Sequence, residues 1–204
     1  VHFDSPDERG IDVALLYRKS VFIPMAFESR RLLLSKDNDK RDYTRDQLVV
    51  EGLLDNERIH FIVNHWPSRS GGEARSRPFR LAAAKLNKRI IDSIQRNNSL
   101  AKIISMGDFN DDPVDPSIKK VLGVKGEKKQ LDTMSLFGPM EKLFRKGAGS
   151  LAYRDKWNAF DQLYMTANLV INKKGHYRLW KARTFTPRYI IDPKATYRHS
   201  HLHT

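Results

Sequence analysis

Two neighbouring stretches of the chain carry the clearest β-strand pattern. Residues 47–54 and 58–64 are rich in β-forming side chains, and apolar positions recur at every second residue of the later stretch. Asp55 and Asn56, which both favour tight turns, lie between them. The pattern therefore predicts a β-hairpin.

Two earlier stretches also have strand character. Residues 11–17 are apolar apart from Asp12, which is typical of a buried strand, and residues 22–27 form a weaker candidate. Pro24 lies in the weaker stretch and lacks an N–H donor, so it favours a place at the edge of a sheet. Residues 35–43 are strongly polar and are predicted to form a loop.

An α-helix is predicted after the hairpin. Ser76 is a candidate N-cap, Pro78 suits the first helical turn, and Asn97 and Asn98 mark the end. One face of this helix is apolar, with Phe79, Ala83, Leu86, Ile90 and Ile94 at helical spacing.

Residues 102–107 follow the helix as a short apolar strand that ends at Gly107. A strand, a helix and a second strand in succession form a crossover unit, in which the two strands lie parallel in one sheet. The residues that follow 58–64 and 102–107 are then expected at the same edge of that sheet.

Asp108 and Asn110 come directly after the second of these strands. Residues two apart on an extended backbone project to the same side, so both side chains can act on one reacting centre. Asp108 can accept a proton or orient a water, and Asn110 can donate a hydrogen bond to a developing oxyanion. Asp111 and Asp112 extend this polar rim. A strand that merely ends in an Asx turn explains the same residues without any chemistry.

His65 occupies the matching place after the other parallel strand, within N-H-W-P-S-R. Pro67 prevents the strand from continuing as a central one. An imidazole there can donate to a phosphate oxygen or protonate a leaving group near neutral pH. The alternative is a histidine packed beside Trp66 with one ring nitrogen bonded to the backbone.

Three further stretches carry candidate chemistry. Residues 68–80 contain four arginines, which suit phosphates, although a solvated loop explains them equally well. Residues 147–157 mix aromatic and basic side chains that can either stack on nucleic acid or be buried. Asp161 begins a predicted strand, F-D-Q-L-Y-M, where it can form a turn or orient a catalytic histidine.

The charge balance points to a class of partner. The 204 residues contain 37 Lys and Arg against 24 Asp and Glu, for a net charge of +13. Residues 1–50 carry nine charges of each sign, whereas residues 151–204 carry ten basic and three acidic side chains. Such a surface attracts polyanions, nucleic acid first and anionic lipid second. A surface that only keeps the protein in solution is the alternative.

Length and composition predict one domain, residues 1–204. No apolar run approaches the ~20 residues that cross a bilayer. The chain has no cysteine, which excludes disulfides, thiolate metal ligands and cysteine nucleophiles. Val1 is not an initiator methionine and no secretory-type stretch begins the chain, so a leader can be missing and the compartment stays open.

Three motifs together resemble the endonuclease/exonuclease/phosphatase superfamily, which has the deoxyribonuclease I-like fold. They are N-H-W-P-S-R, G-D-F-N-D-x-P and F-D-Q-L-Y-M, in this order and at these separations. Residues 9–19 also resemble a strand of bacterial members, and the likeness spans approximately residues 4–185. It implies an α+β fold, a two-sheet α/β sandwich with helices outside. It also implies cleavage of phosphoester bonds by an activated water with Mg²⁺, or alternatively Mn²⁺.

The resemblance also implies a role for individual residues. His65 matches the histidine that contacts the scissile phosphate, and Asn110 matches the asparagine that supports the transition state. Asp108 matches the aspartate that orients or deprotonates water, and it is the candidate metal ligand. Asp161 matches the aspartate that partners a C-terminal histidine.

Two parts of the family pattern are missing from this sequence. The family begins with a strand that carries an Asn and a later strand that carries a metal-binding Glu, and nothing before Asp4 supplies either. We therefore expect the chain to begin part-way into the domain, with an incomplete Mg²⁺ site. The family ends in Ser-Asp-His, whereas His199, His201 and His203 lack the preceding Asp and are assigned no role. Their spacing suits either an adventitious metal or a frayed tail.

The sequence thus predicts a monomeric, metal-dependent phosphodiesterase or nuclease that acts on a phosphoester substrate, with nucleic acid favoured. Without the Glu, the fragment can be inactive alone. A phosphatase or lipid phosphodiesterase on the same fold remains an alternative. A second alternative is a basic nucleic-acid-binding module without catalytic activity.

Overall fold

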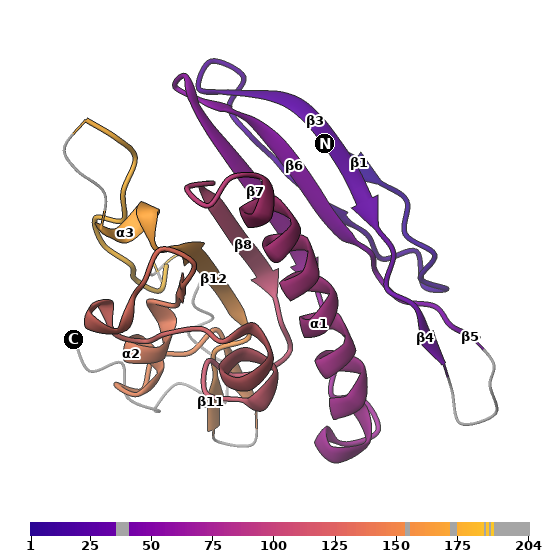
Figure 1. Cartoon of the computed structure of the whole chain (residues 1–204). Helices are drawn as coiled ribbons and strands as arrows, with labels where there is room; N and C mark the ends of the chain where they lie inside the picture. The colour runs from indigo at the N-terminus through magenta and orange to yellow at the C-terminus, as the bar shows by residue number, and fades with distance from the viewer. Residues whose placement is uncertain (36–40, 154–155, 172–174, 186, 188, 190–204) are drawn as a thin grey trace.

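The computed structural model describes residues 1–35, 41–153, 156–171, 175–185, 187 and 189. Its centre is a six-stranded mixed sheet in the order β3-β6-β7-β8-β12-β9, with one long helix, α1, along the sheet (Figure 1). The predicted mixed α and β class is confirmed. The strands are β3 (Phe22–Arg30), β6 (Gln47–Leu54), β7 (Glu57–His65), β8 (Ile103–Asp108), β12 (Asp161–Thr166) and β9 (Leu136–Phe137).

The predicted hairpin is present as β6 and β7, which pair antiparallel from Leu48↔Val63 to Leu54↔Glu57. Asp55 and Asn56 at its turn have φ values of 43° and 69°, in the left-handed region that Asn and Asp tolerate best after glycine. β3 pairs only with β6, so Pro24 lies on an edge strand as predicted.

The crossover unit is also confirmed. Helix α1 (Glu73–Asn97) joins β7 to β8, and the two strands pair parallel. The predicted start of the helix was wrong, because Gly72 is the N-cap and Ser76 lies inside the helix. Gly71 and Gly72, with φ values of 76° and 106°, end the preceding loop and place the boundary at Glu73.

Apolar side chains cover both faces of the sheet. On the face of α1, Ile62 and Ile103 pack with the helix residue Ile91. The other face packs against the N-terminal segment, where β1 (His2–Phe3) pairs with β2 (Val13–Ala14). The predicted strand 11–17 is therefore only this short β2, which lies outside the central sheet. Its apolar residues, Val13 and Leu15, are buried as a layer over the sheet rather than within it.

The remaining elements are short. Two-stranded sheets join β4 (Leu34–Ser35) to β5 (Arg41–Asp42) and β10 (Leu151–Tyr153) to β11 (Lys156–Asn158). A π-helix spans Ser117–Leu122, a 3₁₀ turn Lys128–Gln130, and the helices α2 and α3 span Met140–Phe144 and Asn168–Ile171. No helix in the described part of the chain is both long and apolar enough to traverse a bilayer. His199, His201 and His203 lie outside the described residues.

Candidate active site at the edge of the central sheet

His65, Asp108 and Asp161 lie side by side at one edge of the sheet. His65 ends β7, Asp108 ends the parallel strand β8, and Asp161 begins the antiparallel strand β12. The strand registers pair Asp108 with both of the others. Directly paired residues project from the same face of a sheet, and His65 Nε2 is 3.7 Å from Asp108 Oδ2. The fold thus brings together three candidates that are far apart in sequence.

Asn110 follows Asp108 at this edge, but its backbone conformation differs from the extended one that was predicted. β8 ends at Asp108, and Asn110 has a left-handed φ of 50°, so the two residues do not share an extended backbone. The Asn110 N–H donates to Asp108 Oδ1 at 2.8 Å, which is an Asx turn. The Asn110 side chain is 8% exposed, and its amide donates to the Trp66 carbonyl at 2.9 Å. A carboxamide has a second N–H, and that is the donor it can offer a substrate.

The surroundings shift both reacting groups toward their neutral forms. Burial raises the pKa of Asp108, and the neighbouring Asp161 raises it further, while the Asn110 N–H and His65 act in the opposite direction. Burial also lowers the pKa of His65, with the nearby Arg45 charge adding to the effect. His65 is therefore neutral at pH 7, with one ring nitrogen able to donate and the other able to accept.

Arg45 is a site neighbour that the sequence did not reveal. Its side chain is 4% exposed, donates to Asp7 Oδ2 at 3.0 Å and donates to the Trp66 carbonyl at 2.8 Å. The same carbonyl accepts the Asn110 amide, so one backbone oxygen links Arg45 to the candidate site. A charged residue just before a strand looks solvated in sequence, and no local pattern marks it as buried.

Asp111 and Asp112 were predicted at the rim but are buried instead. Asp111 accepts from Arg80 Nε at 2.6 Å and from Ser117 at 2.6 Å, and the Arg80 side chain is 0% exposed. Asp112 accepts the Ala159 N–H at 2.8 Å. Asp111 therefore holds the loop after β8 against α1, and Asp112 holds it against the segment before β12, because each carboxylate has donors that compensate for its burial.

The four arginines of residues 68–80 separate into different roles. Arg69 bonds Asp115 at 2.7 Å and lies 4.5 Å from the ring centre of Phe160. Arg80 is buried with Asp111, and Arg77 pairs with Glu73 along the helix. Arg75 is exposed and forms no ion pair with any described residue. Neither phosphate binding nor a solvated loop describes the group as a whole.

The edge can supply two carboxylates to a divalent metal. Mg²⁺ is commonly held by one or two carboxylates, with waters and substrate phosphates as further ligands. Asp108 and Asp161 face each other across paired strands, and their mutual repulsion favours a cation between them. In the described part of the chain, a group of three potential ligands is found at His2, Asp4 and Asp12, and it includes none of the candidate site residues. The donor set therefore fits Mg²⁺ only if waters and substrate complete it.

Comparison with known proteins identifies the family. Residues 1–204 match the sequence profile of the endonuclease/exonuclease/phosphatase family. The chain belongs to this family. Members of the family are phosphoester hydrolases and generally use divalent metals. No curated protein sequence matches the chain.

The fold of this chain is similar to that of several solved structures. Truncated TDP2 of Caenorhabditis elegans superimposes with a TM-score of 0.50 at 14% identity, covering 72% of this chain and 53% of TDP2. TDP2 of D. rerio with single-strand DNA product has a TM-score of 0.47 at 15% identity, covering 73% and 55%. A mannosyl-6-phosphatase of Bacteroides thetaiotaomicron has a TM-score of 0.44 at 16% identity, covering 74% and 55%. The chain thus spans about half the length of the structures it resembles.

Proposed function

We propose that the chain is a metal-dependent phosphoester hydrolase, a nuclease or phosphodiesterase that activates water with the help of Mg²⁺. The observation that carries this proposal is the row of His65, Asp108 and Asp161 across three paired strands, with 3.7 Å between His65 Nε2 and Asp108 Oδ2. Groups so spaced can contact a phosphate oxygen and its attacking water together, and the Asp108 carboxylate can accept a proton.

The roles follow from the state of each side chain. Asp108 aligns the attacking water and takes its proton. Neutral His65 donates a ring N–H to a phosphate oxygen, and the second amide N–H of Asn110 supports the developing charge. Asp108, with Asp161 beside it, would hold Mg²⁺, which when bound polarises the phosphate and stabilises the leaving oxygen. Asp161 also raises the pKa of Asp108 by its charge.

Nucleic acid is the favoured substrate because of charge. The net charge of +13 attracts a polyanion more strongly than a small singly charged phosphate ester. A fold of this kind does not by itself decide the substrate. A phosphatase or lipid phosphodiesterase therefore remains the enzymatic alternative, and a binding module without turnover is the alternative outside catalysis. We propose that the protein acts as a monomer.

Replacing Asp108 by Asn tests the mechanism. Asn keeps an oxygen that can accept the Asn110 N–H, but it cannot take a proton from water. We expect Mg²⁺-dependent cleavage of DNA to fall by about 10²–10⁴-fold, with DNA affinity in EDTA nearly unchanged. The measurements are single-turnover cleavage and fluorescence anisotropy.

Asp4→Asn is the control, because it removes the same charge from a side chain that is 96% exposed. It should leave both readouts unchanged. Equal cleavage by the Asp108 variant and the unaltered protein would contradict the mechanism. Release of inorganic phosphate from monoesters without DNA cleavage would instead identify a phosphatase, and salt-sensitive DNA binding without turnover would identify a binding module.

A further inference from the structure

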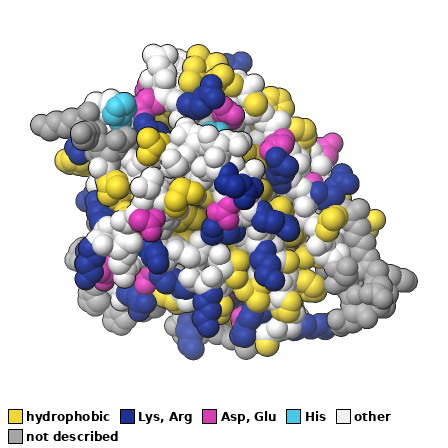
Figure 2. All heavy atoms as spheres, in the orientation of Figure 1, with side chains coloured by type: hydrophobic (Ala, Val, Ile, Leu, Met, Phe, Trp, Pro, Cys, Tyr) yellow, Lys and Arg dark blue, Asp and Glu magenta, His cyan; other side chains and the backbone are white. Residues whose placement is uncertain are grey.

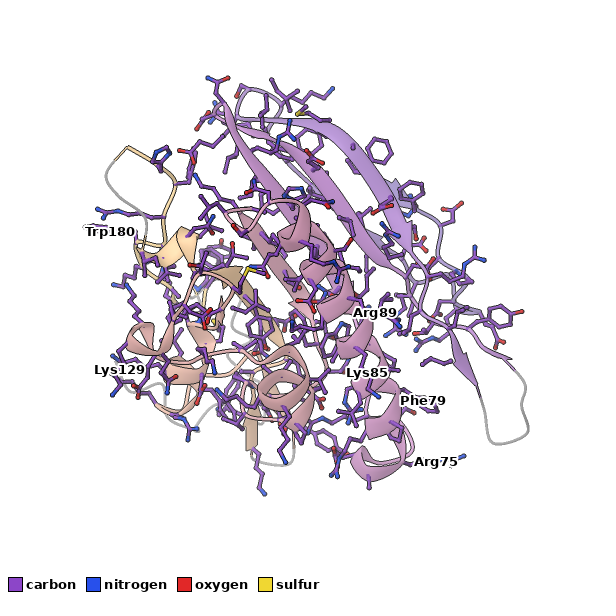
Figure 3. The ribbon with its side chains drawn as sticks, in the orientation of Figure 1. Arg75, Phe79, Lys85, Arg89, Lys129 and Trp180 are labelled. Atoms are coloured by element: carbon purple, nitrogen blue, oxygen red, sulfur yellow. The ribbon has the colours of Figure 1, made fainter. Side chains whose placement is uncertain are left out.

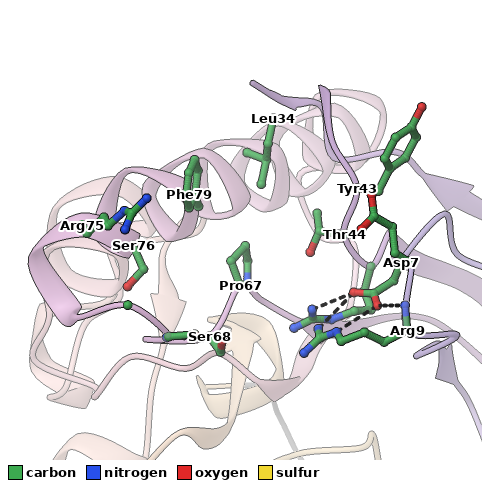
Figure 4. A pocket seen from close by; sticks show the side chains of 14 residues that line it. Asp7, Arg9, Leu34, Tyr43, Thr44, Pro67, Ser68, Arg75, Ser76 and Phe79 are labelled. Atoms are coloured by element: carbon green, nitrogen blue, oxygen red, sulfur yellow. Dashed lines mark hydrogen bonds and ion pairs between the residues drawn. The ribbon is translucent and has the colours of Figure 1, made fainter. Parts of the chain in front are cut away.

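A pocket of about 790 Å³ opens next to the candidate active site (Figure 4). Its walls come from the turn at Asp7–Arg9, the segment before β6, the loop after β7 and the start of α1. Pro67 and Ser68 line it and lie two and three residues after His65 in the chain. Arg45 also lines it and shares the Trp66 carbonyl with Asn110. A molecule bound at the sheet edge can therefore extend into this pocket.

The start of α1 gives one wall an affinity for anions. The first N–H groups of a helix have no helical partners, and Gly72 has no side chain with which to cap them. Glu73, the acidic residue of the first turn, is paired with Arg77 and Arg80. Arg75 lines the pocket with no ion pair to a described residue. Of the first helical residues after the Gly72 cap, Arg75 lines the pocket, so a phosphate placed here would meet its guanidinium.

Two buried polar atoms in the opposite wall lack partners. Thr44 is 4% exposed, and its hydroxyl forms no hydrogen bond. Nε of Arg45 is likewise buried and unpaired, although the other guanidinium nitrogens are bonded. Figure 4 shows the Thr44 hydroxyl on the side that faces Pro67 across the pocket. A buried polar atom without a partner is costly, so these two point to a ligand that would satisfy them.

The pocket also has a mouth with charges of both signs, Arg9 and Glu8, and an apolar side. Arg9 is exposed there, and the buried carboxylate of Asp7 is already bonded to Arg9 and Arg45. Leu34, Phe79 and Pro67 supply apolar surface between the polar walls. A phosphate ester that carries a flat apolar group matches both features, because bases can lie on aromatic and aliphatic side chains.

We propose that this pocket binds the nucleotide next to the scissile phosphodiester of a single-stranded nucleic acid. Its phosphate lies against Arg75, and its base lies against Phe79 and Leu34. The unpaired Thr44 hydroxyl bonds to the same nucleotide. The assignment rests on the proposed function for the identity of the neighbouring site, and it adds that the substrate is a single strand rather than a compact monoester.

Binding of a fluorescent short oligothymidylate, measured by anisotropy in EDTA, tests the pocket without requiring turnover. Arg75→Ala should weaken binding about tenfold, because it removes a charged donor. Arg89→Ala removes the same charge from an exposed position further along α1, as Figure 3 shows, and Arg89 does not line the pocket. This variant should change affinity by less than about twofold. Equal weakening of binding by both variants would show general electrostatic attraction and contradict the proposed binding pocket.

Thr44→Val provides a second test with little risk to folding. Valine keeps the shape and removes a hydroxyl that has no partner, so the melting temperature should stay the same or rise. Affinity for the oligothymidylate should fall about three- to tenfold. An unchanged affinity at unchanged stability would exclude the Thr44 contact and contradict the proposed nucleotide position.

Cleavage of bis(4-nitrophenyl) phosphate separates the two proposals. This small diester reaches the candidate active site without a second phosphate, so Arg75→Ala and Thr44→Val should leave its hydrolysis intact. If both variants weaken oligothymidylate binding while the unaltered protein hydrolyses neither substrate, the pocket stands and the proposed catalytic function fails. If the unaltered protein hydrolyses the substrates but neither variant weakens oligothymidylate binding, the proposed catalytic function stands and the proposed nucleotide pocket is contradicted.

Discussion

Neighbouring aspartates of one short motif have different environments and therefore different roles. Asp108 lies at the open edge of the sheet, where His65 and Asp161 are its titratable neighbours. Asp111, three residues later, is buried with Arg80 as its ionic partner. Because a buried charge is tolerated only with partners, Asp111 is a structural residue even though the sequence places it beside the candidate active site.

Replacing Asp111 by Asn should destabilise the protein strongly. Asn retains the shape but leaves the buried Arg80 guanidinium without its closest anion, and breaking such a pair costs about 3 kcal/mol. The free energy of unfolding from urea titration measures the loss. Asp92→Asn is the matched control, since the Lys88–Asp92 pair on α1 is partly exposed and should contribute little. Similar losses in the two variants would contradict a structural role for the Asp111–Arg80 pair.

At the scale of elements, the close pairing of β7 with β8 aligns the candidate site. Gly107 lies opposite Asn64, one residue before Asp108. Its φ is 131°, and a Cβ at this position would lie 2.0 Å from the Asn64 carbonyl oxygen. A side chain here would force the strands apart at the point where His65 and Asp108 meet. Only glycine allows this backbone and this approach.

Gly107→Ala should therefore lower both stability and activity. We expect a loss of about 2–4 kcal/mol in unfolding free energy, from the unfavourable φ and the clash with backbone. Gly123→Ala is the control, because its φ of 72° is also left-handed but nothing lies within 4 Å of the added Cβ. Thermal and urea unfolding compare the two variants. Equal losses would mean that the contact with β7 contributes nothing beyond the φ preference.

The sequence predicted the presence of these elements more accurately than their first and last residues. Hairpin, crossover helix and following strand were all recognisable, because their apolar periodicity is local. The helix start at Glu73 was missed because Ser76 resembles a cap, whereas the glycine pair before Glu73 decides the boundary. Residues 11–17 looked like a buried strand because their burial is evident in the sequence, but the layer in which they are buried is not.

At the scale of the whole molecule, the basic charge is spread over the surface. Figure 2 shows Lys and Arg side chains across the face that carries α1, with fewer Asp and Glu among them. With a net charge of +13, such a surface attracts a polyanion toward the protein. General attraction of this kind concentrates nucleic acid near the protein, and local contacts must then position it.

Affinity for single-stranded DNA should accordingly fall steeply with salt. If about three phosphates are neutralised, the logarithm of the association constant should fall with a slope of about −2 against the logarithm of salt concentration. Anisotropy titrations over a series of NaCl concentrations measure the slope. Arg75→Ala should make it shallower by roughly one phosphate contact. An affinity that is independent of salt would exclude backbone neutralisation as the basis of binding.

The sequence by itself determined the elements, the order of the polar motifs and the excess of positive charge, because periodicity, turn residues and composition are properties of the chain alone. It also placed His65 and Asp108 at one edge, since the strands of a crossover unit are parallel. The tertiary structure decided which charged residues are buried. It turned Asn110 inward toward Trp66, paired Asp111 with Arg80, and placed Arg45 and Thr44 beside the pocket. Burial depends on contacts between residues distant in sequence, and no local pattern encodes it.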